Sequence, residues 1–149
     1  MKVLAENRKA RHDYHVLERI EAGVVLSGTE VKSCRAHNVS LAEAYAKPRD
    51  GELWLHGAHI APYEQGNRNN HDPTRTRKLL LHSREIQQLT QAVESRGLTL
   101  VPLRIYFTPR SKVKVEIGLC RGKQTHDKRA DMKRREDDLE ARRVARAFG

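Results

Sequence analysis

Apolar and polar residues alternate along much of this chain, and a period of two is typical of strands that bury one face. One such stretch is Tyr14–Leu26, in which Ala22–Gly23 permits a bend or bulge. The alternation is clearest in two runs, 101–107 and 113–119, which are separated by a short polar turn. These two runs predict an antiparallel hairpin with one apolar and one charged face.

Weaker signals predict further elements between these strands. Leu41–Ala46 and Glu52–Ile60 are strand candidates, joined by a turn at Pro48–Gly51. Thr29 is expected to cap a short helix that runs to about Ala36.

A longer helix is predicted to begin at Ser83 and to end at Gly97, because apolar residues between them recur at helical spacing. The polar, Gly- and Asn-containing stretch Pro62–Pro73 is expected to be a mobile loop. The body of the chain thus predicts about six short strands and two helices.

This set of elements predicts a mainly β fold. A small antiparallel barrel of the oligonucleotide-binding (OB) type, closed or partly open, fits because closure removes exposed strand edges. An open sheet covered by a helix is the alternative. We expect residues 1–121 to form this body and residues 122–149 to form a separate basic tail.

The tail, Gly122–Gly149, contains nine basic and six acidic residues and few apolar ones. Such a segment cannot bury enough apolar surface to offset the entropy of ordering it. From Asp131 it lacks Gly and Pro until its last residue, and it offers oppositely charged pairs at i,i+4. We therefore expect a tail that is disordered alone and helical on a polyanion. A solvated terminal helix or a solubility tail is the alternative.

The overall charge narrows the choice of partner. The formal net charge is +10 and the sequence pI is about 10.0, which favours a polyanion: nucleic acid first, an anionic membrane surface second. We find neither an apolar stretch long enough to span a membrane nor a signal peptide, and we expect a cytoplasmic protein. Cys34 and Cys120 lie among apolar neighbours and are expected to be buried thiols.

Catalytic and cofactor signatures are missing from the sequence. The histidine pairs, 12/15 and 56/59, lie in strand-like segments where their side chains would diverge, so we expect no metal site. There is no phosphate-binding glycine loop and no nucleophile elbow. Scattered carboxylates leave a two-metal nuclease open as a rival. Aromatic residues make up only 5% of the chain, which argues against a binder that stacks several bases.

Five phrases, taken together and in order, resemble the SmpB family, the tmRNA-binding (SsrA-binding) proteins of bacterial trans-translation. They are NRKARHDY at Asn7–Tyr14, EAG at Glu21–Gly23, GTEVKS at Gly28–Ser33, DPTRTRKLLL at Asp72–Leu81, and HDKR at His126–Arg129.

The resemblance implies a non-enzymatic adaptor without a cofactor, which we expect to be monomeric. Its OB-type barrel would bind the tRNA-like domain of tmRNA, and the protein would deliver tmRNA to stalled ribosomes. Its tail would fold as a helix in the empty mRNA channel, near the decoding centre, in place of codon–anticodon pairing. Gln124 departs from the family pattern, where a second lysine is common, so one phosphate contact is in doubt.

Site residues follow from the resemblance by motif. The body contacts to tmRNA would include Asn7, Glu21, Leu80 and Lys114. Further body contacts are assigned mainly from charge: Arg11, His12, Lys32, Arg35, Arg75, Arg77 and Lys78. The ribosome contacts implied for the tail are Lys123, His126, Asp127, Lys128, Arg129, Lys133, Arg134 and Arg135.

Two other functions remain open from the residues alone. One is an enzyme that acts on RNA through the scattered carboxylates. The other is a ribosomal or general RNA-binding protein, which would show little preference for the tRNA-like domain over any duplex.

Overall fold

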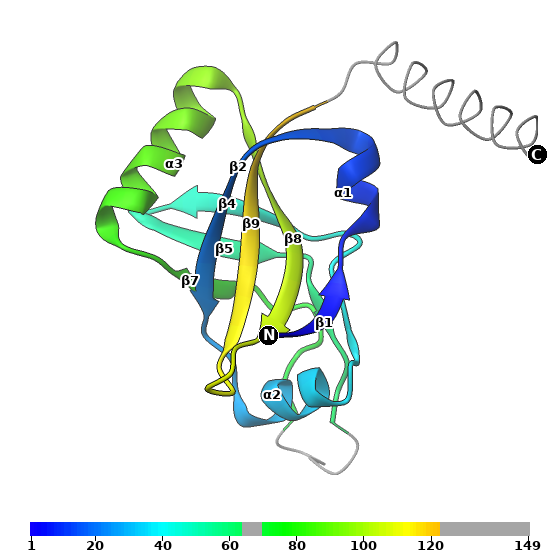
Figure 1. Ribbon diagram of the computed structural model, residues 1–149. Coiled ribbons are helices and arrows are strands. Elements are labelled where there is room, and N and C mark those ends of the chain that lie inside the picture. Colours follow the sequence, from blue (N-terminus) through cyan, green and yellow to red (C-terminus); the bar gives the residue numbers. More distant parts are fainter. Residues whose placement is uncertain (64–69, 123–149) are drawn as a thin grey trace, which may run out of the picture.

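A computed structural model describes residues 1–63 and 70–122 of the protein (Figure 1). The described residues form nine strands and three helices. The strands are β1 (Lys2–Glu6), β2 (Tyr14–Val24), β3 (Val39–Ser40), β4 (Tyr45–Arg49), β5 (Glu52–His56), β6 (His59–Ile60), β7 (Arg77–Leu80), β8 (Thr99–Phe107) and β9 (Val113–Gly122). The helices are α1 (Arg8–Asp13), α2 (Gly28–Arg35) and α3 (Ser83–Arg96).

Six strands close into an antiparallel barrel. Hydrogen bonds join them in the order β4-β5-β7-β2-β9-β8, and Ala46 of β4 pairs with Leu100 of β8 to close the ring. β1 pairs with the far half of β8, while β3 and β6 form a separate small sheet. The predicted mainly β antiparallel barrel is therefore confirmed, and the open sheet is not what the chain forms.

Alternate side chains of the barrel strands fill its interior. The fully buried ones include Leu53, Leu79, Leu100, Val115 and Ile117. Helix α3 adds Ile86, Leu89 and Ala92 to the same core and ends at Gly97, whose φ of 63° is the left-handed conformation expected of a glycine cap.

The predicted hairpin exists, but β8 does not have one apolar and one charged face. A register shift between Pro102 and Arg104 sends Val101 and Leu103 to the outside, while Ile105 and Phe107 stay inside. The two outward residues are buried in a second, smaller core beneath α1.

Helix α1 was missed in the sequence because its six residues are mostly charged. Asn7 starts it: the Asn7 side-chain oxygen accepts a hydrogen bond from the Ala10 amide, as in other N-caps. Ala10, 2% exposed, then packs against Val101, Leu103 and Cys120. Ala10 thus packs α1 against the outside of the barrel.

Several element boundaries also differ from the prediction. Ser27, not Thr29, caps α2, through a capping box in which Glu30 accepts from the Ser27 amide. β4 continues through Pro48 to Arg49, and the predicted strand over 52–60 breaks at Gly57. Gly57 has a φ of 73°, and a Cβ there would lie 2.4 Å from the Glu43 carbonyl oxygen, so only glycine fits.

Candidate nucleic-acid interface

Three of the motif-derived site residues lie together on the outer wall of the barrel. Leu80 of β7 pairs with Gly23 of β2, and Gly23 pairs with Lys114 of β9. Glu21 lies two residues from Gly23 and therefore points to the same side of the sheet. Leu80 is 51% exposed, unusually so for a leucine next to the core. We call Glu21, Gly23, Leu80 and Lys114 the β7–β2–β9 patch.

Gly23 leaves room for its neighbours in this patch. A Cβ at position 23 would lie 3.2 Å from the Leu80 Cβ and 3.6 Å from the Lys114 Nζ. The first contact is tighter than ordinary packing, so a larger side chain would push Leu80 aside and crowd Lys114.

We expect Gly23→Ala to weaken binding of an RNA ligand to this patch by about three- to tenfold, equivalent to roughly 0.7–1.4 kcal/mol. Gly28→Ala is the matched control, because a Cβ there meets nothing within 4 Å. Filter binding and thermal unfolding of both variants would separate lost affinity from lost stability. Equal affinities for the two variants would contradict a role for the patch in binding.

Glu21 is held by a buried tyrosine. The Tyr106 hydroxyl donates a short hydrogen bond to the Glu21 carboxylate, and Tyr106 is only 4% exposed. Burial, and then the Glu21 carboxylate, raise the pKa of Tyr106 well above its usual range, so it stays a donor. An RNA-facing carboxylate needs such support, because phosphates repel it; it could accept from a base amino group.

Charge compensation continues next to Tyr106. Arg104 donates two hydrogen bonds to Glu116 at 3.0 and 3.2 Å, and Arg19 donates one at 3.0 Å. The Arg104 guanidinium also lies 5.6 Å from the centre of the Tyr106 ring. The charges of Arg19, Arg104 and Glu116 therefore compensate one another on this wall of the barrel, next to Lys114.

Arg77 is not an RNA contact, and the expectation that it would be one is wrong. Its side chain is 0% exposed and donates to the Glu30 carboxylate at 2.5 Å and to the carbonyl oxygens of Ala58 and Pro73. A guanidinium enclosed in this way cannot reach a phosphate. Arg77 instead ties β7 to α2 and to the chain before β7.

Arg75 belongs to the same network. Its guanidinium donates to both Glu30 oxygens and to the Val25 carbonyl, and 34% of its side chain is exposed. Burial acts to raise the pKa of Glu30, but hydrogen bonds from Arg75, the Ser27 amide and Arg77 outweigh it and hold that pKa below its ordinary value. Glu30 is therefore an ionised carboxylate inside the protein.

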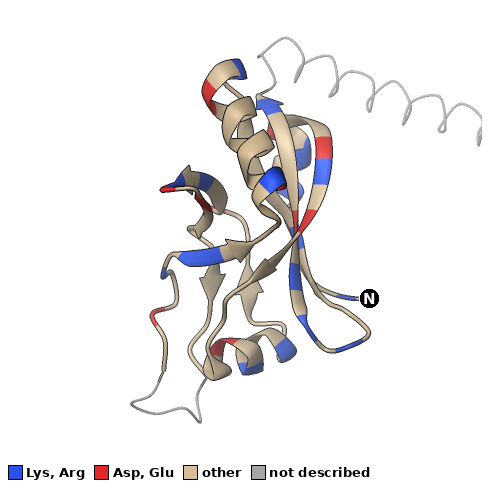
Figure 2. Ribbon diagram, turned by 90° about the vertical axis from the view of Figure 1, so that its left-hand side faces the viewer, with Lys and Arg blue, Asp and Glu red and all other residues tan. Residues whose placement is uncertain are grey.

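The other charged candidates on α2 and β7 lie at the surface. Lys32 is exposed, with its Nζ 5.3 Å from the centre of the Tyr63 ring, and Arg35 is exposed at the end of α2. Lys78 is half-buried and forms an ion pair of 3.6 Å with Glu52. Figure 2 shows these cations of α2 at the same end of the barrel as those of the turn between β8 and β9.

The N-terminal candidates lie on α1 and just before it, on the outside of the barrel. Arg11 and His12 are exposed on α1, where His12 Nδ1 lies 2.9 Å from Asp13 Oδ1. Asn7 is 6% exposed, and its amide group both caps α1 and donates to the Pro102 carbonyl oxygen. Asn7 and Arg11 line a pocket together with Arg19 and Glu116. Because Arg19 lies at the middle of β2, the two groups of candidates are not separated by the full length of that strand. Their contacts with RNA remain predictions, and those of Lys123–Arg135 lie outside the described residues.

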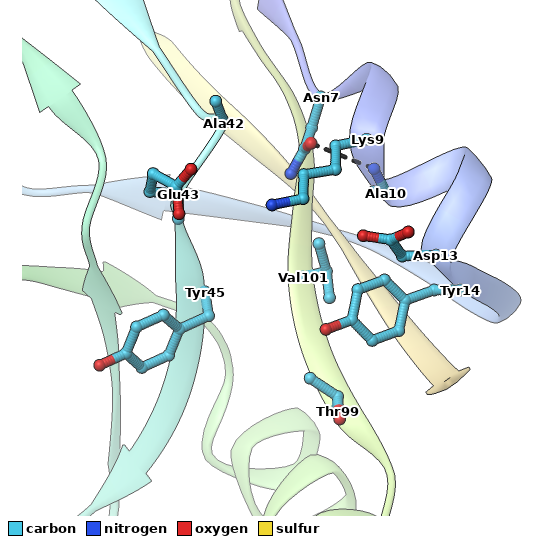
Figure 3. A pocket seen from close by; sticks show the side chains of 11 residues that line it. Asn7, Lys9, Ala10, Asp13, Tyr14, Ala42, Glu43, Tyr45, Thr99 and Val101 are labelled. Atoms are coloured by element: carbon cyan, nitrogen blue, oxygen red, sulfur yellow. Dashed lines mark hydrogen bonds between the residues drawn. The ribbon is translucent and has the colours of Figure 1, made fainter. Parts of the chain in front are cut away.

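A cleft opens between α1 and β4 (Figure 3). It has a volume of about 320 Å³ and is lined by Asn7, Lys9, Ala10, Asp13, Tyr14, Ala42, Glu43, Ala44, Tyr45, Thr99 and Val101. Its charged side chains are one lysine and two carboxylates, so it is not a strongly basic pocket. Across residues 1–63 and 70–122, no group of three His, Cys, Asp or Glu side chains is placed to hold a metal ion.

The two cysteines are free and buried, as predicted. Burial raises the pKa of each thiol to about 11; the Glu30 carboxylate adds to the effect at Cys34. Neither is a thiolate at neutral pH. No helix within the part of the chain that the structure describes is both long and apolar enough to cross a membrane.

Tyr106 and Glu30 support the site, and neither role was predicted from the sequence. A tyrosine within the mostly apolar run 101–107 is the signal for the first, since a buried hydroxyl needs a partner. A glutamate three residues after Ser27 is the signal for the second, as part of a capping box. In neither case does the sequence identify the distant partner.

Comparison with known proteins decides the family. The profile described as SmpB protein matches residues 4–147. The chain belongs to the SmpB family. It is 53% identical over 146 residues to the SsrA-binding protein of Carboxydothermus hydrogenoformans, covering 98% of this chain and 97% of that protein. It is 56% identical over 143 residues to the SsrA-binding protein of Symbiobacterium thermophilum, covering 96% and 90%.

A solved structure supports the same assignment. One chain of the structure described as "tmRNA-SmpB: a journey to the center of the bacterial ribosome" matches with a TM-score of 0.68 and 53% identity. The match covers 83% of this chain and 90% of that chain. The family resemblance inferred from the five sequence phrases is thereby confirmed.

Proposed function

We propose that this protein binds the tRNA-like domain of tmRNA and delivers it to stalled ribosomes for trans-translation. The observation that carries the proposal is membership of the SmpB family over nearly the whole chain, whose relatives are named for binding SsrA and include a chain solved with tmRNA at the ribosome. The net charge of +10 supports a nucleic-acid partner independently.

In this proposal the body, residues 1–121, holds the RNA. The β7–β2–β9 patch offers three chemistries within one short stretch of barrel wall: an exposed apolar side chain, a carboxylate fixed by Tyr106, and a lysine. A phosphate would meet Lys114, while Glu21 would accept from a base amino group. Lys32, Arg35 and Lys78 would add phosphate contacts.

The tail, residues 122–149, acts on the ribosome in this proposal. Its cations would meet rRNA phosphates in the empty mRNA channel, and His126 would stack on an rRNA base. Gly122 pairs with Tyr14 at the end of the barrel next to α1, so the tail leaves the body roughly 30 Å from the β7–β2–β9 patch. This separation would let the two parts bind different RNAs at once.

Competition between two RNAs tests the proposal. The full-length protein would be titrated with the tRNA-like domain of tmRNA and with a duplex of equal length, at about 50 and 200 mM salt. We expect the preference for the tRNA-like domain to survive the higher salt, because contacts to shape and bases do not depend on counterion release. Equal affinities that fall together with salt would leave only a general RNA-binding protein.

A further inference from the structure

Three aromatic side chains gather on one face of the barrel wall: Tyr45, which is exposed, and Trp54 and His56, which are half-buried. Tyr45 of β4, and Trp54 and His56 of β5, point outward, because their strand neighbours Ala46, Leu53 and Leu55 are buried inside. We define the β4–β5–β7 face by five outward residues: Tyr45, Lys47, Trp54, His56 and Lys78. The low aromatic content of the chain gave no hint of this clustering.

Two of these rings already form a stack. The rings of Tyr45 and His56 are 5.1 Å apart between centroids and inclined by 9°. His56 is braced from the other side, where its Nδ1 lies 3.4 Å from the Thr76 hydroxyl oxygen. Tyr45 nevertheless remains 44% exposed, and Figure 3 shows it projecting from β4 beside the cleft. A rigid, partly exposed ring is a prepared surface for another flat group.

Trp54 lies between two cations. It pairs with Lys47 of β4 on one side and with Lys78 of β7 on the other. Neighbouring strands are about 4.8 Å apart, so both lysine stems start beside the indole ring. The indole Nε1 donates to the Arg49 carbonyl oxygen at 3.3 Å, which fixes the ring against the wall.

A surface on which aromatic rings alternate with lysines is suited to a single-stranded nucleic acid. Unpaired bases stack on aromatic rings while the phosphates between them meet cations. A duplex offers no free base faces and could use only the lysines. The Lys78–Glu52 pair is no obstacle, since both side chains are about 40% exposed and such pairs exchange readily.

The face also continues an interface already described. Lys78 and Leu80 both point outward from β7, so the β4–β5–β7 face adjoins the β7–β2–β9 patch along one strand. We propose that the β4–β5–β7 face binds an unpaired RNA segment, with its bases stacked on Tyr45 and Trp54 and its phosphates on Lys47 and Lys78. This inference rests on the proposed function only in taking RNA as the partner.

The single tryptophan of the chain makes the proposal measurable, because all tryptophan fluorescence comes from Trp54. The full-length protein would be titrated with an unstructured RNA strand of about 12 nucleotides, within the site size of such faces, and with a duplex of equal length. Fluorescence anisotropy of labelled RNA would measure binding separately. We expect the single strand to quench Trp54 and the duplex to bind without quenching.

Substitutions on the β4–β5–β7 face test which of its side chains bind the RNA. Tyr45→Ala should weaken single-strand binding roughly 5- to 150-fold, the range expected for loss of one stacked base. Lys47→Gln with Lys78→Gln should lower both the affinity and its salt dependence. Lys2→Gln with Lys112→Gln is the charge-matched control, with both changes at exposed positions away from this face, and should retain the quenching.

Three outcomes would overturn the inference: saturation by the single strand without quenching, equal quenching by the duplex, or unchanged affinity of Tyr45→Ala. The proposed function fails separately, when the wild-type protein shows no preference for the tRNA-like domain in the competition assay. If the protein prefers the tRNA-like domain but single strands do not quench Trp54, the proposed function stands and the proposed role of the β4–β5–β7 face is wrong.

Discussion

Replacing Glu30 by glutamine is expected to destabilise the protein by about 3–5 kcal/mol, because it leaves the enclosed Arg77 guanidinium without its counter-charge. Both Glu30 and Arg77 are 0% exposed and their charged atoms are 2.5 Å apart. Several kcal/mol is a large part of the stability of a domain of this size. Urea unfolding followed by circular dichroism would measure the loss.

Glu52→Gln is the matched control. Glu52 also pairs with a cation of β7, Lys78, but at 3.6 Å and with both side chains substantially exposed. Its loss should change the stability by no more than about 1 kcal/mol. If the two glutamine variants were equally stable, the buried network would contribute no more than a surface ion pair.

The effect of Glu30→Gln should depend on pH in a defined direction. The folded pKa of Glu30 lies below its ordinary value of 4.5, so its contribution is complete above that value and is lost as the pH falls through the folded pKa. The gap in stability between wild type and Glu30→Gln should therefore be constant near neutral pH and should shrink below about pH 4.5. A gap that widened in acid would contradict an ionised Glu30.

The second large effect is expected from deleting residues 123–149. The truncated body should bind the tRNA-like domain with nearly unchanged affinity, but peptide tagging on stalled ribosomes should be abolished. The reason is the proposed division of labour, in which body and tail meet different RNAs. The measurements are filter binding to the tRNA-like domain and tag addition in a reconstituted translation system with a truncated mRNA.

The experiment needs a control for charge, since the deletion of residues 123–149 removes nine cations and six carboxylates. A tail of the same composition in scrambled order keeps the net charge and should also fail to support tagging. A loss of affinity for the tRNA-like domain of more than about tenfold, roughly 1.4 kcal/mol, would contradict the division of labour. Tagging by the scrambled tail would show that charge alone suffices.

The sequence by itself determined the strands whose apolar residues alternate and the helix with a clear glycine stop. It also carried the family assignment, because the five phrases are short, local and in order. Such features depend on neighbours within a few residues, where backbone geometry alone sets which side chains share a face. The end of α3 at Gly97 and the hairpin of β8 and β9 are of this kind.

Tertiary structure alone decided the roles of Arg77, Glu30 and Val101. In the sequence Arg77 is one of three cations in a run, and Glu30 is 47 residues away, so nothing local shows that the two are enclosed together. The bulge in β8 turned Val101 outward, where α1 covers it. Strand order around the barrel likewise brought Leu80 next to Lys114 and set Trp54 between Lys47 and Lys78. Burial and pairing between distant segments depend on closure of the whole barrel, which no local pattern encodes.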